Sequence, residues 1–363
     1  MHEAKRILVF RMGQLGDMLV SVPAMWALRK YFRNAHITLL SDNHPGKGYV
    51  TSSDVFNSSG MVDDIVFYPA YSSGNQLFSW LRKMFLLLRY LRSKQYELLV
   101  YLVPCRGRHQ IRDTVFFRLA GIKRFIGIKE FQHLPKQVFG SVLPVVQQEG
   151  DLLLDRLRRS GIPIPPLGRG QVYLNIGEKE NTTVKQWLEN LPSDGNRRWI
   201  AVGAGSKMPV KIWPTERYAE VVKHLIKEFD IWPVVFGGSD DKELGQFLIK
   251  QWARGYNAAG VLSVREGIAA LAKCVLYIGN DTGVIHMAVA AGIKCVGIYS
   301  ARDYPGNWHP YGHGHIVLRN RRPCEGCMLE ACSERKAECI MSIHVNDVFQ
   351  ACAKVLREEL QNG

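Results

Sequence analysis

The feature that most constrains the fold is a regular alternation of strand-like and helix-like segments. The apolar run RILVFRM is broken by GQLGD, a segment with helical periodicity follows over residues 18–32, and the strand-like HITLL comes next. Further along, a helical pattern over residues 77–94 leads into the strand-like YELLVYLV. Because parallel strands need crossover connections, this alternation predicts a doubly wound parallel α/β sheet.

The alternation starts a second time after an interruption. The stretch SGIPIPPLGRG, at residues 160–170, is rich in proline and glycine and is the best linker candidate. Strand-like RRWIAVGAGS and IWPVVFGG then alternate with the helical TERYAEVVKHLIKEF, and Ser263 and Glu266 stand at capping-box spacing. A chain of 363 residues is too long for one ordinary core. We expect two Rossmann-like domains, residues 1–170 and 171–363, that face each other across a cleft, with the final helix packing on either domain.

The sequence contains no pattern typical of a membrane-spanning or exported protein. Hydrophobic residues make up 47% of the chain, which supports sizeable cores, yet no run approaches the roughly 18 consecutive apolar residues of a membrane span. The start, MHEAKRILVF, lacks the apolar core and cleavage site of a signal peptide. We therefore expect a cytoplasmic protein with reduced thiols.

Positive charge is concentrated in the first half of the chain. Residues 1–170 hold 24 Lys and Arg against 12 Asp and Glu, whereas the remainder holds 23 against 21. This excess indicates an anionic partner for the first half, such as an acidic or phosphorylated sugar, a lipid surface or nucleic acid. Nucleic acid is disfavoured because the aromatic residues do not interleave with Lys and Arg as a stacking platform requires.

Four polar turns follow strand-like runs, where an open α/β fold places its ligands. The first, RMGQLGDML, combines Gly13 and Gly16 with Asp17, and it lacks the third glycine of a dinucleotide fingerprint, which disfavours a nicotinamide dehydrogenase. Asp17 either caps the next helix or serves as a carboxylate at the ligand edge. The second turn, GAGSKMPVKIWP, brings Ser206 and Lys211, a combination suited to a phosphate.

The other two turns carry carboxylates beside glycines. GGSDDKELG begins with Gly237 and Gly238, and its acidic cluster could bind ribose hydroxyls or cap the next helix. GNDTGVIHMAVAAG places Asp281 at the start of a small apolar helix, where it could cap the helix while backbone N–H groups face a diphosphate. The joint placement of all four turns predicts a ligand-binding site.

Three longer stretches resemble glycosyltransferase family 9, the heptosyltransferases of lipopolysaccharide assembly. They are RILVFRMGQLGDMLVSVPAMWALRKYF, KIWPTERYAEVV and YIGNDTGVIHMAVAAGIKCVGIYSARDYPGNWHPYG, and the similarity extends from about residue 5 to residue 350. The resemblance implies the GT-B architecture, inversion at the anomeric carbon and no divalent metal for the chemistry. It implies a nucleotide-sugar donor and a lipopolysaccharide core or another bacterial surface glycan as acceptor.

The resemblance also implies roles for individual residues. Asp17 matches the catalytic base, and Lys211 matches a lysine that faces the donor phosphates. Asp281 matches the carboxylate that binds the donor sugar. The full set expected to contact the donor is Gly13, Gly16, Ser206, Gly237, Gly238, Asp281, Thr282, Gly283 and His286. Where the family commonly has His-Pro-Gly, this chain has Gly203-Ala204-Gly205. ADP-heptose is the expected donor. Because of this departure from the family pattern, a donor with a different base or a different sugar stays an alternative.

Three classes of function follow from these observations. The leading one is an inverting glycosyltransferase, in which a base acts on the acceptor hydroxyl and cations stabilise the departing nucleoside diphosphate. A nucleotide-sugar epimerase of the same fold would not need a basic acceptor face. A basic nucleic-acid-binding protein is the remaining alternative, from a different class.

Basic residues near two further strand ends are candidates for binding an anionic acceptor. CRGRHQIRD follows the strand-like YELLVYLV and supplies Arg106, Arg108 and Arg112, which could bind phosphate or carboxylate in a bidentate manner. Lys47 in DNHPGKG could join them.

Two segments allow a structural and a functional interpretation. The run CEGCMLEACSERKAEC supplies Cys324, Cys327, Cys332 and Cys339, which are either free thiols or ligands of a structural zinc or iron. The amphipathic stretch 77–94 carries Arg82, Lys83, Arg89, Arg92 and Lys94. It is either a crossover helix with its basic residues in solvent, which we favour, or a helix in peripheral contact with the anionic inner membrane surface.

Overall fold

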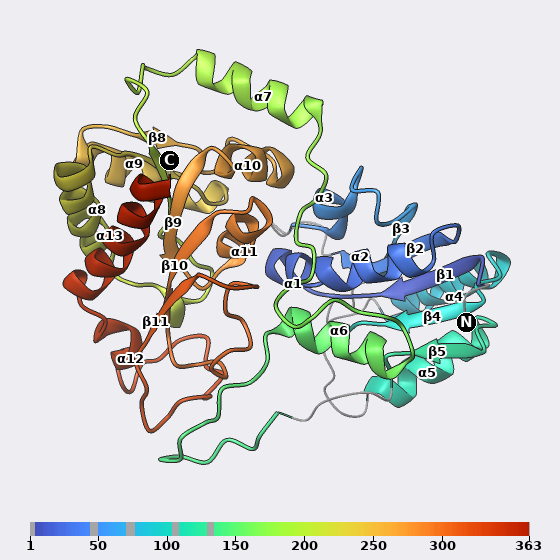
Figure 1. The fold of residues 1–363 in the computed structure, drawn as a ribbon. Helices are drawn as coiled ribbons and strands as arrows, with labels where there is room; N and C mark the ends of the chain where they lie inside the picture. The colour runs from blue at the N-terminus through green and yellow to red at the C-terminus, as the bar shows by residue number, and fades with distance from the viewer. Residues whose placement is uncertain (1–3, 44–49, 70–76, 104–108, 129–133, 363) are drawn as a thin grey trace. The chain divides into compact units, whose positions relative to one another are not determined.

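The computed structural model describes residues 4–43, 50–69, 77–103, 109–128 and 134–362. The chain divides into two compact units (Figure 1). The first unit consists of Met1–His133 and Glu149–Asn175, and the second of Leu134–Gln148 and Ile176–Gly363. None of the helices in the described ranges is long and apolar enough to cross a membrane.

The first unit is built on a five-stranded parallel sheet with the order β3-β2-β1-β4-β5. Its strands are β1 (Arg6–Phe10), β2 (His36–Asn43), β3 (Asp64–Pro69), β4 (Leu98–Tyr101) and β5 (Arg124–Ile126). Its helices are α1 (Leu15–Val20), α2 (Val22–Tyr31), α3 (Ser52–Phe56), α4 (Leu77–Ser93), α5 (His109–Leu119) and α6 (Glu149–Arg159). The central strand β1 is almost wholly apolar and buried, as expected for a parallel strand covered on both faces.

One face of this sheet is covered by α4 and α5. Leu87 and Leu91 of α4 and Phe117 of α5 share a buried cluster with Phe10 of β1 and Tyr101 of β4. On the other helical layer, α2 packs against α6. The sheet is therefore the middle layer of a three-layer α/β unit.

The second unit contains a six-stranded parallel sheet with the order β11-β10-β9-β6-β7-β8. Its strands are β6 (Trp199–Gly203), β7 (Trp232–Val235), β8 (Tyr256–Asn257), β9 (Cys274–Asn280), β10 (Lys294–Tyr299) and β11 (Ile316–Arg319). Its α-helices are α7 (Glu178–Glu189), α8 (Thr215–Phe229), α9 (Lys242–Trp252), α10 (Val264–Leu271), α11 (Gly283–Ala290), α12 (Glu338–Met341) and α13 (Val345–Asn362). Two short 3-10 helices complete it, η1 (Pro209–Lys211) and η2 (Ser239–Asp241).

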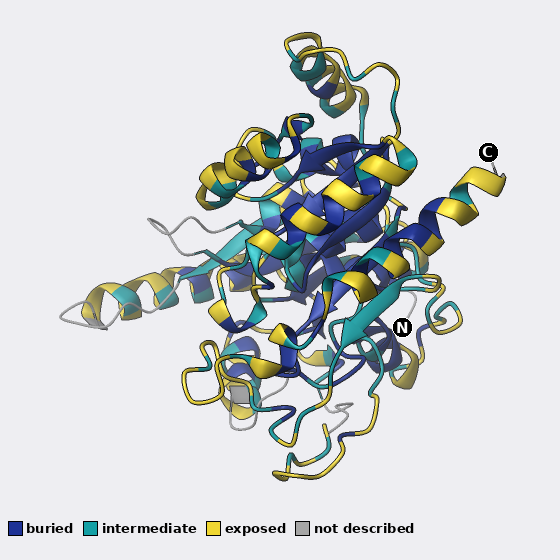
Figure 2. Cartoon of the chain, turned by 90° about the vertical axis from the view of Figure 1, so that its left-hand side faces the viewer, coloured by how far each residue is buried: buried dark blue, intermediate teal, exposed yellow. Residues whose placement is uncertain are grey.

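The C-terminal helix α13 belongs to the core of the second unit. It packs against α8 and against β9 and β10, and Val348, Cys352 and Val355 lie in the same buried cluster as the sheet residues. Figure 2 shows the central strands as buried, whereas the edge strand β11 is of intermediate burial and the helices present exposed outer faces. Helix α10 begins with the capping box predicted from the sequence, because the Ser263 hydroxyl accepts the Glu266 N–H while the Glu266 carboxylate accepts the Ser263 N–H.

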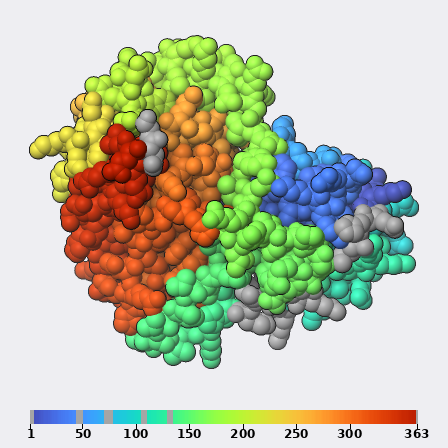
Figure 3. Space-filling model, in the orientation of Figure 1, coloured from blue at the N-terminus to red at the C-terminus, as the bar shows by residue number. Residues whose placement is uncertain are grey.

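Residues 134–148 precede α6 in the sequence yet belong to the second unit. The Gly140 N–H donates to the Pro323 carbonyl at 2.7 Å, and the Val146 N–H donates to the Pro305 carbonyl at 2.8 Å. The sea-green atoms of this segment lie against the orange and red atoms of the second unit in Figure 3. The chain therefore passes between the two units three times.

Candidate functional site

The strand order of the second unit has a reversal between β6 and β9. From β6 the chain proceeds to β7 and β8 on one side, and from β9 it proceeds to β10 and β11 on the other. Open α/β sheets bind ligands at such a reversal, beyond the carboxyl ends of the strands. Lys211 lies in the loop after β6, Asp281 directly follows β9, and Asp303 follows β10.

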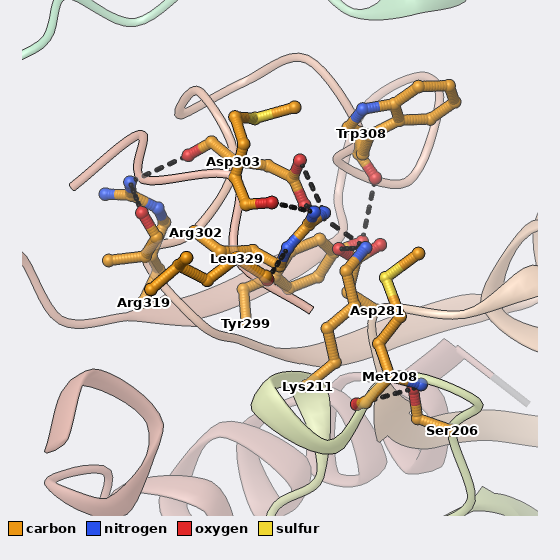
Figure 4. A network of polar contacts seen from close by, with 12 residues as sticks. Ser206, Met208, Lys211, Asp281, Tyr299, Arg302, Asp303, Trp308, Arg319 and Leu329 are labelled. Atoms are coloured by element: carbon orange, nitrogen blue, oxygen red, sulfur yellow. Dashed lines mark hydrogen bonds and ion pairs between the residues drawn. The ribbon is translucent and has the colours of Figure 1, made fainter. Parts of the chain in front are cut away.

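These three side chains form one buried charged cluster (Figure 4). The Lys211 Nζ lies 2.5 Å from an Asp281 carboxylate oxygen and 3.2 Å from an Asp303 carboxylate oxygen. Arg302 adds a second cation, because its guanidinium lies 2.8 Å from the Asp303 carboxylate. The sequence analysis predicted that Lys211 and Asp281 contact different parts of one ligand. In the structure the two side chains contact each other directly.

Burial determines the electrostatics of this cluster. Burial raises the pKa of the Asp281 carboxyl, and Asp303 raises it further, against the opposing effect of Lys211. Burial also works to lower the pKa of the Lys211 ammonium, but the charges of Asp281 and Asp303 outweigh it, so this pKa is raised. Lys211 is therefore a cation at neutral pH. The Asp281 carboxyl is held in its charged form by Lys211, against the effects of burial and of Asp303.

Asn280 fixes the Lys211 loop to the end of β9. Its side-chain oxygen accepts hydrogen bonds from the Trp213 N–H at 3.1 Å and the Tyr218 hydroxyl at 2.8 Å. Its amide nitrogen donates to the Ala204 carbonyl at 2.6 Å. Because Asn280 is buried and the Trp213 side chain is fully buried beside it, the loop that carries Lys211 is held at both ends.

A second layer of contacts positions Arg302 and Asp303. The Arg302 guanidinium donates to the carbonyls of Leu329 and Met328 at 2.6 and 2.9 Å. Arg319 donates to the Asp303 carbonyl at 3.0 Å and pairs with the buried Glu325 at 2.9 Å. Sequence reasoning missed Arg302 and Asp303, and the only signal was their place in the quoted stretch YSARDYPG after a strand-like run.

The predicted phosphate-binding loop after β6 is tightly structured. The Ser206 hydroxyl hydrogen-bonds to the backbone N–H and carbonyl of Met208, at 3.1 and 3.2 Å. Gly205 and Gly237 have no room for a Cβ atom because the Asp241 carboxyl group packs against both. The Gly238 N–H donates to this carboxylate at 2.9 Å. Gly237 therefore makes room for the helix-capping Asp241, whereas Gly238 contacts this residue through its backbone N–H and has open space beside its Cα atom.

Helix α11 starts next to the charged cluster. Thr282 is its N-cap residue in extended backbone conformation, and no side-chain hydrogen bond from Thr282 caps the helix that begins at Gly283. His286 is buried in the first turns, and burial, together with the charges of Lys211 and His315, lowers its pKa to about 3. His286 is consequently neutral at physiological pH, so it adds no positive charge for a phosphate.

In the first unit, Asp17 lies at the start of α1, after the central strand β1. One of its carboxylate oxygens accepts the Gln14 N–H at 2.9 Å, and the other lies 3.7 Å from the Arg11 guanidinium. Arg11 is fully buried and also donates to the Leu102 carbonyl, beyond β4, at 2.7 Å. Because β1 and β4 flank the reversal of strand order in this sheet, Asp17 also lies at a ligand edge.

The two glycines of this turn have different surroundings. Gly13 has a φ of +132°, its N–H donates to the buried Asp42 at 2.9 Å, and a Cβ atom there would collide with Asp17. Gly16 lies within α1. Asp42, at the end of β2, was not anticipated from the sequence.

The predicted acceptor-binding residues are only partly visible. Lys47, Arg106 and Arg108 lie outside the described residues. Arg112 lies on α5, where its guanidinium donates to Asp113 at 2.8 Å while keeping most of its side chain exposed.

The four neighbouring cysteines are all described. Cys324, Cys327 and Cys332 are partly exposed and Cys339 is buried, and none of the four forms a disulfide. Burial raises the pKa of Cys339, and Cys324 and Cys327 contribute to the same direction. Over the described ranges, no group of three or more His, Cys, Asp or Glu side chains is arranged to hold a metal ion. The structural metal stays a prediction.

Two parallel α/β units, each with polar side chains at its strand ends, define a protein of the GT-B fold class, as the sequence predicted. A family model described as glycosyltransferase family 9 (heptosyltransferase) matches residues 86–338. The chain belongs to this family and is a glycosyltransferase, which confirms the resemblance seen in its motifs.

Individual relatives agree with this assignment. Lipopolysaccharide heptosyltransferase 2 of Escherichia coli is 30% identical over 162 residues, which cover 42% of this chain and 44% of that protein. The chain thus spans less than half the length of that curated relative. The glycosyl transferase family 9 protein from Veillonella parvula matches 98% of both chains with a TM-score of 0.74 and 20% identity. The ADP-heptose lipopolysaccharide heptosyltransferase II of Escherichia coli gives a TM-score of 0.68 at 22% identity and covers 98% of this chain and 99% of its own.

Proposed function

We propose that the protein transfers a heptose or related sugar from a nucleotide-sugar donor, ADP-heptose, to a lipopolysaccharide core or another bacterial surface glycan. The reaction inverts the anomeric carbon, needs no metal and takes place in the cytoplasm. The family membership supports sugar transfer, and the relatives named for lipopolysaccharide support the substrate class. The observation that carries the proposal is the cluster of Lys211, Asp281 and Asp303 at the strand reversal of the second unit.

The cluster suits the two chemically different parts of a nucleotide sugar. Carboxylates accept hydrogen bonds from sugar hydroxyls, a role for Asp281 and Asp303. The Lys211 ammonium and the N–H groups at the start of α11 stabilise a departing diphosphate, which accumulates charge in the transition state. Donor binding requires Lys211 to exchange part of its contact with the carboxylates for contact with phosphate.

Asp17 is the proposed general base for the acceptor hydroxyl. Its exposed fraction of 26% leaves the carboxylate accessible, while Gln14 and Arg11 restrain its orientation. The basic excess of residues 1–170 suits an anionic acceptor, for which Lys47, Arg106, Arg108 and Arg112 are proposed contacts. Charge reversal of Arg106 should then raise the acceptor KM more than the donor KM.

The test of this proposal is the variant Asp17→Asn. Asparagine keeps an oxygen that can accept the Gln14 N–H, so α1 retains its cap. The loss of a general base should lower kcat by about 10²–10⁴-fold, while the donor Kd, measured by calorimetry, stays the same. Asp54→Asn is the matched control, because Asp54 occupies the same capping-box position at the start of α3.

Four outcomes would contradict the proposal. Near-normal turnover of Asp17→Asn would exclude Asp17 as the base. Equal losses in Asp17→Asn and Asp54→Asn would assign the effect to helix capping. A thermal shift with UDP-sugars but not with ADP-heptose would exclude the proposed donor, and loss of turnover in EDTA would exclude metal independence.

A further inference from the structure

Helix α4 exposes a continuous stripe of aromatic and basic side chains. Its inward face packs on the sheet through Leu87 and Leu91. The opposite face carries residues 78, 82, 85, 89 and 92, which follow one another at helical spacings of four and three. Phe78 is 85% exposed and Phe85 is 58% exposed, so two large rings on this stripe are open to solvent.

The adjoining helix α5 extends this apolar area. Ile111, Val115 and Leu119 recur every four residues and are exposed, with Ile111 at 73%. Both helices cover the same face of the sheet and contact each other, so their outer faces are neighbours. We call the exposed residues of the two helices the α4–α5 surface: Phe78, Leu81, Phe85, Leu86, Tyr90, Ile111, Val115 and Leu119.

The α4–α5 surface collects most of the exposed large apolar side chains of its unit. Among the described residues of the first unit, only Leu167 and Tyr173 are exposed large hydrophobics outside it. Scattered exposed apolar residues need no explanation, whereas a contiguous patch marks an interaction site. The helical spacing and the contact between α4 and α5 make this patch contiguous.

The charge around the patch is of one sign. Helix α4 and the residue after it carry Arg82, Lys83, Arg89, Arg92 and Lys94, and the sequence has no Asp or Glu between Asp64 and Glu97. The Arg89 guanidinium lies over the Phe85 ring at 6.0 Å, and the Lys94 ammonium lies over the Tyr90 ring at 5.2 Å. Cations are therefore held beside the rings, at the level where a lipid headgroup would meet them.

We propose that the α4–α5 surface docks the protein onto an anionic lipid bilayer, with α4 lying in the plane of the interface. Phe78 and Phe85 enter the acyl boundary, and the basic side chains contact the lipid phosphates. Charge complementarity selects this occupant, because a basic stripe without carboxylates matches the negative leaflet surface. The favoured sequence interpretation, a crossover helix with only its basic residues in solvent, accounts for the inward face but not for the exposed rings.

The test measures partition of the full chain onto vesicles without donor or acceptor. Flotation compares phosphatidylcholine vesicles with vesicles that also contain phosphatidylglycerol. We expect binding to the anionic vesicles that weakens with salt. Arg82→Gln combined with Arg89→Gln should lower the partition coefficient about 25-fold, at about fivefold for each charge. Phe78→Ser combined with Phe85→Ser should lower it at least about tenfold.

The matched control is Phe247→Ser combined with Lys250→Gln, an exposed aromatic and a basic residue on α9 of the second unit. It should bind vesicles like the unaltered protein. All variants should keep the same circular dichroism and the same thermal unfolding midpoint, which shows that they fold.

Three results would overturn the proposal. One is equal partition onto neutral and anionic vesicles. Another is unchanged partition of the Phe78 and Phe85 variant. A third is a change of mass by light scattering in that variant with vesicle binding retained, which would assign the surface to a second copy of the chain. Because no substrate is present, none of these results depends on the proposed sugar transfer.

Discussion

Replacing Lys211 by methionine should destabilise the second unit in a pH-dependent manner. The substitution keeps the length of the side chain and removes the ammonium that lies 2.5 Å from Asp281 and 3.2 Å from Asp303. Asp303 retains the Arg302 guanidinium at 2.8 Å, so Asp281 is the carboxylate that loses its ion-pair partner. Its side chain is only 6% exposed. Breaking a buried pair by removing one partner costs about 3–5 kcal/mol, which is the loss expected at pH 8.

The expected pH dependence follows from the Asp281 carboxyl. Burial and Asp303 raise its pKa, and removing Lys211 takes away the main opposing charge. In the unfolded chain this carboxyl has a pKa of about 3.9. Between the two values the folded state binds more protons than the unfolded state, so stability decreases as the pH rises through this window. The loss in Lys211→Met should therefore shrink toward pH 5, by about 1.4 kcal/mol for each pH unit below the new pKa.

The assay is urea unfolding followed by tryptophan fluorescence at pH 8 and pH 5. Lys207→Met, an exposed lysine in the same loop, is the control and should change the free energy of unfolding little. The double variant Lys211→Met with Asp281→Asn should recover most of the loss at pH 8, because no buried carboxylate is left alone. An unfolding free energy of Lys211→Met equal to that of the unaltered protein at pH 8, or an equal loss at both pH values, would refute the reasoning.

Three further outcomes are expected. Asn280→Leu should lower the free energy of unfolding by about 3 kcal/mol in a urea titration, since three buried hydrogen bonds are lost; an unchanged midpoint would disprove that Asn280 anchors the loop. The His286 imidazole, with its pKa of about 3, should not titrate between pH 8 and pH 5 by NMR. Between pH 6.5 and pH 3 this imidazole is protonated in the unfolded chain but neutral in the folded protein, so the free energy of unfolding decreases as the pH falls through this range. A His286→Asn variant should therefore lose less of its free energy of unfolding in acid than the unaltered protein. Glu325→Gln removes the ion pair with Arg319 and should speed proteolytic cleavage within residues 134–148; equal cleavage rates would contradict this.

Periodicity and local chemistry predicted much of the fold. The helical pattern TERYAEVVKHLIKEF coincides with α8, and the spacing of Ser263 and Glu266 produced the expected capping box. These features arise from contacts between residues a few positions apart, so they can be predicted from the local sequence without knowledge of the tertiary structure. The alternation of strands and helices likewise determined the parallel sheets, because parallel strands need crossovers.

The candidate site was harder to predict because it is assembled from distant loops. Lys211 and Asp281 were identified as separate ligand contacts, but their direct pairing depends on the adjacency of β6 and β9, which are far apart in the sequence. Asp303 was missed because its loop has no glycine-rich turn to mark it. The role of Asp241 was also missed: its carboxyl group packs against Gly237, whereas the expected contact of Gly237 and Gly238 with the donor stays a prediction. The exposure of Phe78 was also hidden, since apolar periodicity does not distinguish a packed face from an open one.

The excursion of residues 134–148 into the second unit bears on the construction of chimeric transferases. A chimera with one breakpoint near residue 175 would combine this segment from one parent with the Glu325 and Pro305 loops of another. The Glu325 carboxylate, which accepts the Leu143 N–H at 2.7 Å, would then face a foreign backbone. A second unit that keeps its native contacts must therefore be exchanged as two pieces, residues 134–148 together with residues 176–363. If this unit binds the donor as proposed, donor specificity should move between family members only when both pieces are exchanged together.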